Sequence, residues 1–290
     1  MCLWGYEGMA QFKSWNSYEL FNREVARQRR YVRTPRAEEF LRAVASSCNT
    51  RLRPVPEGRI FWRAQLRHDS RTVEEPSYRY EELVAVGPSR MKPREERARE
   101  GRANPKGIPC LYLSTTADAA MSEVRPWVGA LVSVAQFKVV RPLTIVDCSV
   151  LHDQYFNLAY LSRTFDDLGQ NKPWSPDEIE KIVWAAIDAA FAEPVTDTDD
   201  VADYAPTQTL AELFRSEGYD GVAYKSAFGE EGYSVALFDL NSARQLNGAL
   251  RQVKSIKFEF KDNSQDEYFI DDDGNAVRAV VESVGPVPKK

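Results

Sequence analysis

One stretch constrains the fold of this chain more than any other: residues 101–126, with the sequence GRANPKGIPCLYLSTTADAAMSEVRP. Its glycines, asparagine and prolines predict a turn-rich loop at the start. A short apolar run with a central tyrosine, residues 108–114, then predicts a buried strand. Thr116 is a good helix N-cap, and the residues after it predict a short helix that Pro126 ends. The stretch therefore predicts a loop, a strand and a helix in direct succession.

This unit brings together four side chains of different chemistry. Arg102 and Asn104 belong to the loop, Tyr112 to the strand and Glu123 to the helix. Taken singly, each has a simpler interpretation, because a loop Arg or a helical Glu is usually solvated and a strand Tyr usually packs. A cation, an amide, an aromatic ring and a carboxylate on one short unit are more typical of a functional site.

Composition limits the class of protein. With 290 residues, 43% of them hydrophobic and 11% aromatic, the chain can form one large packed domain with appendages. It contains no apolar run long enough to span a bilayer, and its N-terminal residues lack the basic start and apolar core of a signal peptide. We therefore expect a soluble, cytoplasmic protein with no membrane partner.

The few cysteines and histidines argue against several kinds of chemistry. Four cysteines without a CxxC pair indicate neither a zinc ribbon nor a disulfide framework. The two histidines are isolated in the sequence, which argues against a mechanism based on histidine and against a metal site. We therefore predict no metal. The net charge of −5 argues against direct binding of nucleic acid. Residues 90–102 are a local exception, because this segment is rich in arginines interleaved with glutamates. It is either a solvated segment or one that gathers an anionic ligand.

The remaining elements suggest three parts. Apolar residues at helical spacing predict two helices, residues 17–32 and 37–46, which form an N-terminal cap over residues 1–57 with Phe40, Leu41 and Val44 inward. Ser175 and Glu178 predict a capping box at the start of a later helix. Residues 58–242 are the predicted catalytic domain, and residues 243–290 a C-terminal β-ribbon appendage.

Two further residues are candidates for a site. Arg63 lies on a predicted strand on the same face as Phe61, and a half-buried Arg needs an anion, although a strand-end Arg that points to solvent is the alternative. Ser226 ends a predicted strand before a glycine-bearing loop. A serine there is usually a turn residue, and no GxSxG motif surrounds it, so a serine hydrolase is not indicated.

Together these segments resemble the RES domain family. The matching stretches are FWRA, which contains Arg63; GRANPKGIPCLYLSTTADAAMSEV, which contains Arg102 to Glu123; and YDGVAYKSAFGEEGYSVALFD, which contains Tyr224 and Ser226. Each motif alone is loose, but their order and spacing over residues 59–239 are fairly specific. The segment DYAPTQTLAELF before the last motif is also similar to the family.

The resemblance implies a fold and a function. The expected fold is α/β (α+β), with a split, mostly antiparallel sheet, surrounding helices and a likeness to ADP-ribosyltransferases. The expected function is that of a bacterial toxin that consumes NAD by phosphorolysis or hydrolysis and is restrained by an antitoxin with a helix-turn-helix DNA-binding domain. NAD is then a substrate, with inorganic phosphate as one alternative co-substrate, and no cofactor is expected.

The resemblance also implies roles for individual residues. A carboxylate beside the ribose stabilises an oxocarbenium-like state, an Arg fork holds the pyrophosphate, and an aromatic ring stacks on the nicotinamide or ribose. The implied catalytic residues are Glu123, Arg63 and Ser226. The implied NAD-binding residues are Arg63, Arg102, Asn104, Tyr112, Ser114, Tyr224 and Ser226. Ser226 is expected at the rim of the cleft as a hydrogen-bond donor and not as a nucleophile, because no base is available to activate it.

Departures from the family pattern leave alternatives open. Ala103 stands where the family often has an aromatic residue, and Phe228 and Ser234 stand where it often has Arg and Asn. These differences leave the acceptor and the mode of partner binding open. A mono-ADP-ribosyltransferase that modifies a protein and a non-catalytic partner-binding module therefore remain alternatives. The oligomeric state is open as well, with a homodimer among the options.

Overall fold

The computed structural model describes residues 10–94, 97–155, 157–160, 164, 174–193, 201–226, 228, 232–257, 266–270 and 276–280. The chain divides into two compact units, Met1–Val253 and Lys254–Lys290. No helix in the described part of the chain is both long and apolar enough to cross a bilayer.

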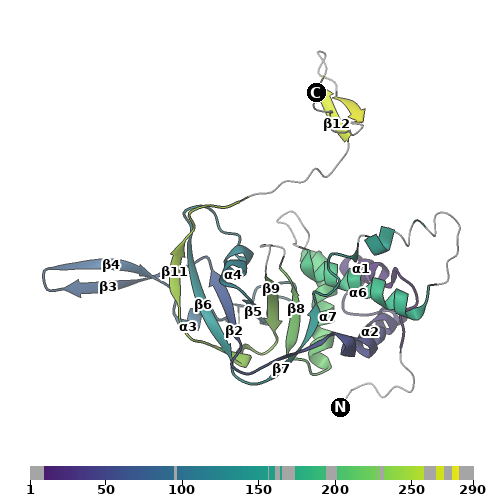
Figure 1. Cartoon of the computed structure of the whole chain (residues 1–290), viewed down its shortest axis with the longest axis horizontal. Helices are drawn as coiled ribbons and strands as arrows, with labels where there is room; N and C mark the ends of the chain where they lie inside the picture. Colours follow the sequence, from purple (N-terminus) through teal and green to yellow (C-terminus); the bar gives the residue numbers. More distant parts are fainter. Residues whose placement is uncertain are drawn as a thin grey trace, which may run out of the picture. The chain divides into compact units, whose positions relative to one another are not determined.

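The first unit contains a large sheet with helices around it (Figure 1). Its helices are α1 (Ser17–Arg27), α2 (Pro35–Ser47), α3 (Pro88–Met91), α4 (Ala117–Glu123), α6 (Pro176–Ala192) and α7 (Ala205–Ser216), with 3-10 turns at Cys48–Arg51, Val201–Tyr204 and Leu240–Ser242. Its strands are β1 (Leu52–Val55), β2 (Ile60–Gln65), β3 (Asp69–Glu75), β4 (Tyr78–Val84), β5 (Leu111–Ser114), β6 (Leu131–Val139), β7 (Leu143–Cys148), β8 (Gly221–Lys225), β9 (Tyr233–Leu237), β10 (Ala243–Gln245) and β11 (Ala249–Gln252).

The sheet is split, as predicted, and mostly antiparallel. The strand order is β1-β7-β8-β9-β5-β2-β6-β10, with β11 also paired to β6, and only β7 and β8 run parallel. The two halves meet where β5 lies beside β2, and a single pair, Trp62 opposite Ser114, joins them there. Beyond this pair the two strands diverge, so their facing backbone groups need other partners.

The N-terminal helices are part of the first unit's core. Phe40, Leu41 and Val44 are 6%, 5% and 0% exposed, which confirms the predicted inward face of α2. The first helix ends earlier than predicted, at Arg27. The Thr34 hydroxyl caps α2 by accepting a hydrogen bond from the Ala37 amide at 3.3 Å, with proline at the first helical position.

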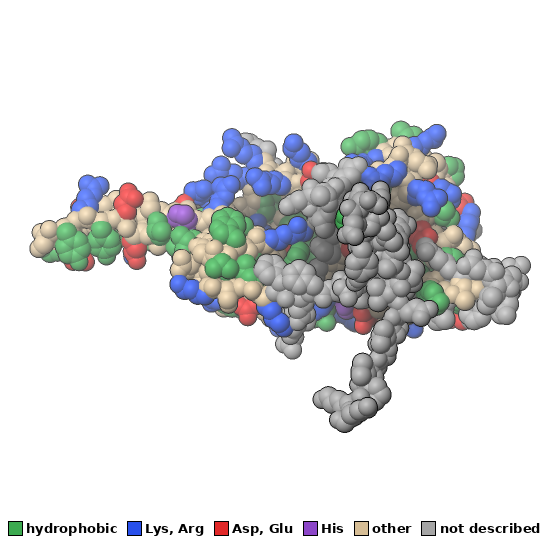
Figure 2. Space-filling view, turned by 90° about the horizontal axis from the view of Figure 1, so that it is seen from above, with side chains coloured by type: hydrophobic (Ala, Val, Ile, Leu, Met, Phe, Trp, Pro, Cys, Tyr) green, Lys and Arg blue, Asp and Glu red, His purple; other side chains and the backbone are tan. Residues whose placement is uncertain are grey.

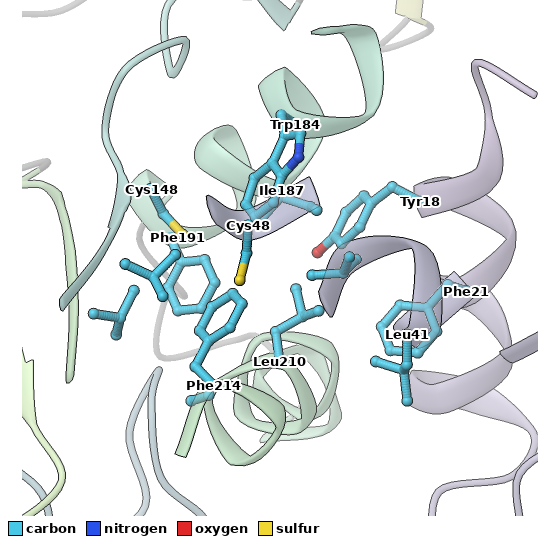
Figure 3. Close-up of a cluster of buried hydrophobic side chains, with 14 of the residues drawn as sticks. Tyr18, Phe21, Leu41, Cys48, Cys148, Trp184, Ile187, Phe191, Leu210 and Phe214 are labelled. Atoms are coloured by element: carbon cyan, nitrogen blue, oxygen red, sulfur yellow. The ribbon is translucent and has the colours of Figure 1, made fainter. Parts of the chain in front are cut away.

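Helices α1, α2, α6 and α7 cover one face of the sheet. Figure 3 shows side chains from these helices, among them Phe21, Leu41, Trp184 and Phe214, converging on one cluster with Cys148 of β7. Helix α6 begins with the predicted capping box of Ser175 and Glu178. The helices therefore fix one face of β7, β8 and β9, the strands that lead toward the candidate site.

Strands β3 and β4 form a hairpin that the sequence analysis did not predict. They pair in antiparallel fashion from Asp69 opposite Val84 to Glu75 opposite Tyr78. The hairpin projects from the sheet (Figure 1), and Tyr78 and Tyr80 stack on it with ring centroids 5.7 Å apart. Its strands carry many charged residues, because neither face of a projecting hairpin is covered by a core.

The C-terminal ribbon begins later than predicted. We expected the appendage to start at residue 243, but β10 and β11 both pair antiparallel with β6 and complete the edge of the main sheet. The second unit contains β12 (Asp266–Ile270), which pairs antiparallel with β13 (Ala276–Val280).

Candidate functional site

A cavity of about 1210 Å³ opens beside the split in the sheet. Its lining includes Arg63 of β2, Tyr112 and Ser114 of β5, Glu123 of α4 and Arg102 of the preceding loop. The residues that the sequence analysis singled out on four separate elements therefore lie around one cavity.

The loop that leads into β5 is held by its own side chains. Asn104 is 1% exposed, and its Nδ2 donates to the carbonyl oxygens of Arg99, Pro105 and Ile108 at 2.9, 3.1 and 2.7 Å. Its Oδ1 accepts from the Tyr112 hydroxyl at 2.6 Å. Asn104 was predicted to bind NAD, but these bonds occupy its amide, so in this structure it shapes the loop.

Tyr112 joins the strand to the loop. Its hydroxyl donates to Asn104 and accepts from the Ala103 amide at 2.9 Å. Burial raises the pKa of the Tyr112 phenol well above its usual value, which keeps the donating proton in place. A Cβ at Gly101 would lie 2.7 Å from this hydroxyl, so only glycine allows the close approach. The tyrosine ring remains part of the cavity wall.

Arg102 is positioned by two neighbours. Its Nη1 donates to the carbonyl oxygen of Phe191 at the end of α6. Its guanidinium carbon lies 5.1 Å from the centre of the Tyr224 ring, a cation–π arrangement. Tyr224 is 4% exposed, and burial raises the pKa of its phenol, with the Arg102 cation acting in the opposite direction. Tyr224 therefore supports the Arg102 guanidinium and is itself part of the cavity lining.

Arg63 spans the split in the sheet. Its Nη1 donates to the carbonyl oxygen of Tyr112 on β5 at 2.7 Å, and its Nε donates to the carbonyl oxygen of Met91 at 2.7 Å. Burial lowers the pKa of its guanidinium to about 10, so Arg63 remains a cation at neutral pH. In the described part of the chain no carboxylate pairs with this half-buried cation, which leaves its charge available to an anion.

Glu123 is held by two serine hydroxyls. Its Oε1 accepts hydrogen bonds from Ser226 Oγ at 2.7 Å and from Ser234 Oγ at 2.8 Å. Glu123 is the last residue of α4, where the helix dipole disfavours a negative charge, and the two donors offset this effect. With both serines on one oxygen, Oε2 makes no hydrogen bond to a described residue and remains for a ligand.

Ser226 acts on Glu123 rather than at the rim. It is 3% exposed, and its hydroxyl also donates to the Phe228 carbonyl oxygen at 3.0 Å. The predicted position at the rim, as a direct donor to the ligand, is therefore wrong for this structure, because both acceptors of its proton belong to the protein. Ser114 is 4% exposed, lies opposite Ser234 in the β5–β9 register and is part of the cavity lining.

Ser234 holds the catalytic candidate Glu123, although its only apparent feature in the sequence is that it stands where the family often has Asn. The sequence did contain a signal for this role: Ser234 lies within an apolar strand, and a serine that is buried there needs a hydrogen-bond partner. Ser234 is 3% exposed in β9, and Glu123 is that partner.

The cavity is strongly cationic. Among the described residues of its lining, nine are Lys or Arg and two are Glu, although the whole chain has a net charge of −5. The cations are Arg63, Arg67, Arg90, Lys92, Arg94, Arg97, Arg99, Arg102 and Arg125. A cleft lined by one sign of charge concentrates ligands of the opposite sign, so this one favours an anion. Within the described residues, no cluster of His, Cys, Asp or Glu is arranged to hold a metal ion.

A comparison with protein-family models agrees with the sequence motifs. The model of the RES domain family matches residues 60–260. Among solved structures, the crystal structure of the M. tuberculosis MbcT–MbcA toxin–antitoxin complex aligns at 14% identity and a TM-score of 0.34, over 72% of this chain and 92% of that chain. A search of curated proteins finds no significant match. Because the family match extends over more than half of the sequence, the chain belongs to the RES domain family.

Proposed function

We propose that this protein consumes NAD by cleaving the bond between nicotinamide and ribose, as an NAD phosphorylase or an NAD glycohydrolase. The observation that carries the proposal is the Glu123 carboxylate, which two serine hydroxyls orient within a cavity dominated by arginines. A dinucleotide that loses neutral nicotinamide and leaves positive charge on its ribose requires an anion site and a positioned carboxylate, and these two features support the proposal.

Arg63 and Arg102 are the proposed partners of the diphosphate. Both line the cavity, and neither is neutralised by a carboxylate in the described part of the chain. A guanidinium presents parallel N–H groups to phosphate oxygens, which makes Arg the preferred residue for this contact. Each already donates to a backbone carbonyl, and these contacts pre-organise the guanidinium groups for the ligand.

Glu123 is the proposed catalytic residue. As the C1–N bond of the nicotinamide ribose breaks, its electron pair neutralises the pyridinium nitrogen and positive charge develops on the ribose. The Glu123 carboxylate stabilises this charge and accepts hydrogen bonds from the ribose hydroxyls. The acceptor oxygen then forms the new bond to C1 and releases its proton: phosphate yields ADP-ribose 1″-phosphate and water yields ADP-ribose. Inorganic phosphate is in the first case a co-substrate, and neither route needs a cofactor.

Tyr112 and Tyr224 complete the proposed binding surface. The Tyr112 hydroxyl is occupied by Asn104 and Ala103, so Tyr112 offers its ring rather than its hydroxyl. Tyr224 is 4% exposed with Arg102 over its ring, so it contributes mainly by supporting that cation. An aromatic face suits the nicotinamide or the ribose.

Incubation of the purified protein with NAD, with and without inorganic phosphate, tests the proposal. Formation of ADP-ribose 1″-phosphate identifies a phosphorylase and formation of ADP-ribose a glycohydrolase. ADP-ribose attached to a protein would identify a mono-ADP-ribosyltransferase. Unchanged NAD under all conditions would contradict the proposal and favour a non-catalytic partner-binding module.

We further propose that a protein partner restrains this activity in the cell. An enzyme that destroys NAD poisons its host, so it requires an inhibitor until it is needed. The family resemblance suggests an antitoxin with a helix-turn-helix DNA-binding domain. Co-expression with the product of a neighbouring gene, followed by copurification and an NAD assay, tests this part; an active complex with unchanged turnover would contradict it.

A further inference from the structure

Four arginines at the outer edge of the cavity have no role in the proposed reaction. We call Arg67, Arg94, Arg97 and Arg99 the outer cation cluster. All four line the cavity and are exposed. None of their side chains makes a hydrogen bond or ion pair with a described residue, in contrast to Arg90, which pairs with Asp69 at 2.6 Å. Figure 2 shows Lys and Arg side chains gathered on the surface beside the projecting β3–β4 hairpin.

Hydrogen bonds hold the backbone at Arg99 and at the residue before it. Ala98 is 7% exposed, and its carbonyl oxygen accepts from the Gly107 amide at 3.0 Å. The next carbonyl oxygen, that of Arg99, accepts from Asn104 Nδ2 at 2.9 Å. A buried alanine between Arg97 and Arg99 anchors the segment, so both side chains are presented to solvent from one position beside the cavity.

Exposure separates the proposed reaction centre from the outer cation cluster. Glu123, Arg63 and Arg102 are half-buried, whereas the four arginines of the outer cation cluster are exposed. If Glu123 lies at the nicotinamide ribose and the two inner arginines at the diphosphate, the adenosine half of the dinucleotide extends toward the outer cation cluster.

We propose that the outer cation cluster, and Arg97 and Arg99 in particular, binds a third phosphoryl group on the adenosine half of the substrate, so that the enzyme accepts NADP and favours it over NAD. This inference rests on the proposed function and names the substrate class of the same site. Arg63 and Arg102 match the two negative charges of the diphosphate. A 2′-phosphate is a phosphomonoester and adds about two further negative charges near neutral pH. Guanidinium forks suit its oxygens. The bond that breaks is the same C1–N bond, so the chemistry is unchanged.

Turnover of NADP and NAD by the full chain tests the proposal. We expect the ratio of kcat/KM for NADP to that for NAD to exceed one, and to fall about tenfold or more in the Arg97→Gln/Arg99→Gln variant, since charge-assisted hydrogen bonds to a phosphate are lost. The matched control is Arg23→Gln/Arg29→Gln. It removes two exposed arginines that do not line the cavity and changes the net charge equally. Its ratio should equal that of the wild type.

A binding measurement distinguishes failure of the NADP proposal from failure of the proposed NAD-consuming activity. Calorimetry with adenosine 2′,5′-bisphosphate and with 5′-AMP needs no catalysis. Tighter binding of the bisphosphate, lost in Arg97→Gln/Arg99→Gln and kept in the control, supports the site even if neither dinucleotide is consumed. Equal affinity for the two nucleotides, or binding of neither, would overturn it. A parallel loss of NAD and NADP turnover would also overturn it and indicate general attraction of anions. A variant that loses only its response to added inorganic phosphate would assign the cluster to free phosphate instead.

Discussion

The hydroxyl of Ser234 lies 2.8 Å from Oε1 of Glu123, the same oxygen that accepts from Ser226. Ser234 is on β9 and Glu123 on α4, so the contact joins the sheet to the helix that carries the carboxylate. Ser226 belongs to the segment after β8. Three segments therefore fix the orientation of one side chain, and the position of Glu123 depends on the register of β8 and β9.

Ser234→Ala tests whether this contact positions Glu123. A hydrogen bond to a charged group contributes about 1.5–3 kcal/mol, so we expect kcat to fall about 10- to 100-fold. KM for NAD should change little, because the proposed contacts of Glu123 strengthen as the glycosidic bond breaks. Ser122→Ala, on the same helix, is the control and should retain full turnover. If Ser234→Ala raises KM and leaves kcat unchanged, Ser234 contributes to binding and does not position the catalytic group.

Arg63→Ala should weaken both NAD binding and the fold. Loss of a charge-assisted hydrogen bond reduces NAD affinity by about 1.5–3 kcal/mol. The structure adds a second effect, because the carbonyl oxygens of Met91 and Tyr112 lose their donor at the split in the sheet. Calorimetric titration with NAD and thermal unfolding measure the two effects separately. Arg59→Ala, an exposed residue beside the same strand, is the control.

Arg63→Lys distinguishes the two roles. Lysine keeps the charge and lacks the planar fork that reaches two carbonyl oxygens and a phosphate together. We expect it to restore part of the NAD affinity and less of the stability. An Arg63→Ala protein with unchanged affinity and a lowered Tm would show that Arg63 only joins the two halves of the sheet.

A buried ion pair outside the cavity predicts a pH dependence of stability. Asp188 Oδ2 accepts from Arg51 Nη1 and from the Leu151 amide, both at 2.8 Å, while Oδ1 has no hydrogen-bond partner among the described residues. Burial raises the pKa of Asp188 to about 6, and Arg51 opposes this shift only in part. The folded state therefore holds the proton more tightly than the unfolded state does. The stability that this gives is complete below the unfolded pKa of about 4 and is lost as the pH rises through 6.

Asp188→Asn removes this titration. Between pH 4 and 7, the free energy of unfolding of the wild type should fall relative to that of Asp188→Asn by up to about 3 kcal/mol, as measured by urea denaturation. Asp153→Asn changes an exposed aspartate and should follow the wild type. Parallel profiles for the wild type and Asp188→Asn would show that Arg51 holds Asp188 ionised across this range.

The parts of the site that the sequence predicts are those within one local unit. Arg102, Tyr112 and Glu123 lie within 22 residues of one another, and the loop, strand and helix that carry them follow from turn, strand and capping signals. The burial of Ser226 and the role of Ser234 depend on contacts with Glu123 across 103 and 111 residues. Local patterns carry no information on such pairing, since it is decided by strand register and by helix packing on the sheet.

The dependence on distant contacts also explains where the observed fold differs from the fold predicted from the sequence. The β3–β4 hairpin has charged residues on both faces, so the alternation that reveals a half-buried strand is absent from its sequence. Strands β10 and β11 are short, and their membership of the main sheet follows from their pairing with β6, which lies about 100 residues earlier in the chain.

The last prediction concerns the effect of Glu123 in cells. Expression of the wild-type protein without an inhibitor should arrest growth and lower cellular NAD. Glu123→Gln keeps the shape of the side chain and removes its charge, and loss of a positioned electrostatic group typically lowers the rate on the order of 100- to 1000-fold. We therefore expect a folded protein that binds NAD, turns it over poorly and permits growth. Glu100→Gln makes the same change at the other carboxylate among the described residues of the lining and should remain toxic. Growth arrest by Glu123→Gln with unchanged NAD turnover would show that the two-serine arrangement orients a side chain that takes no part in the reaction.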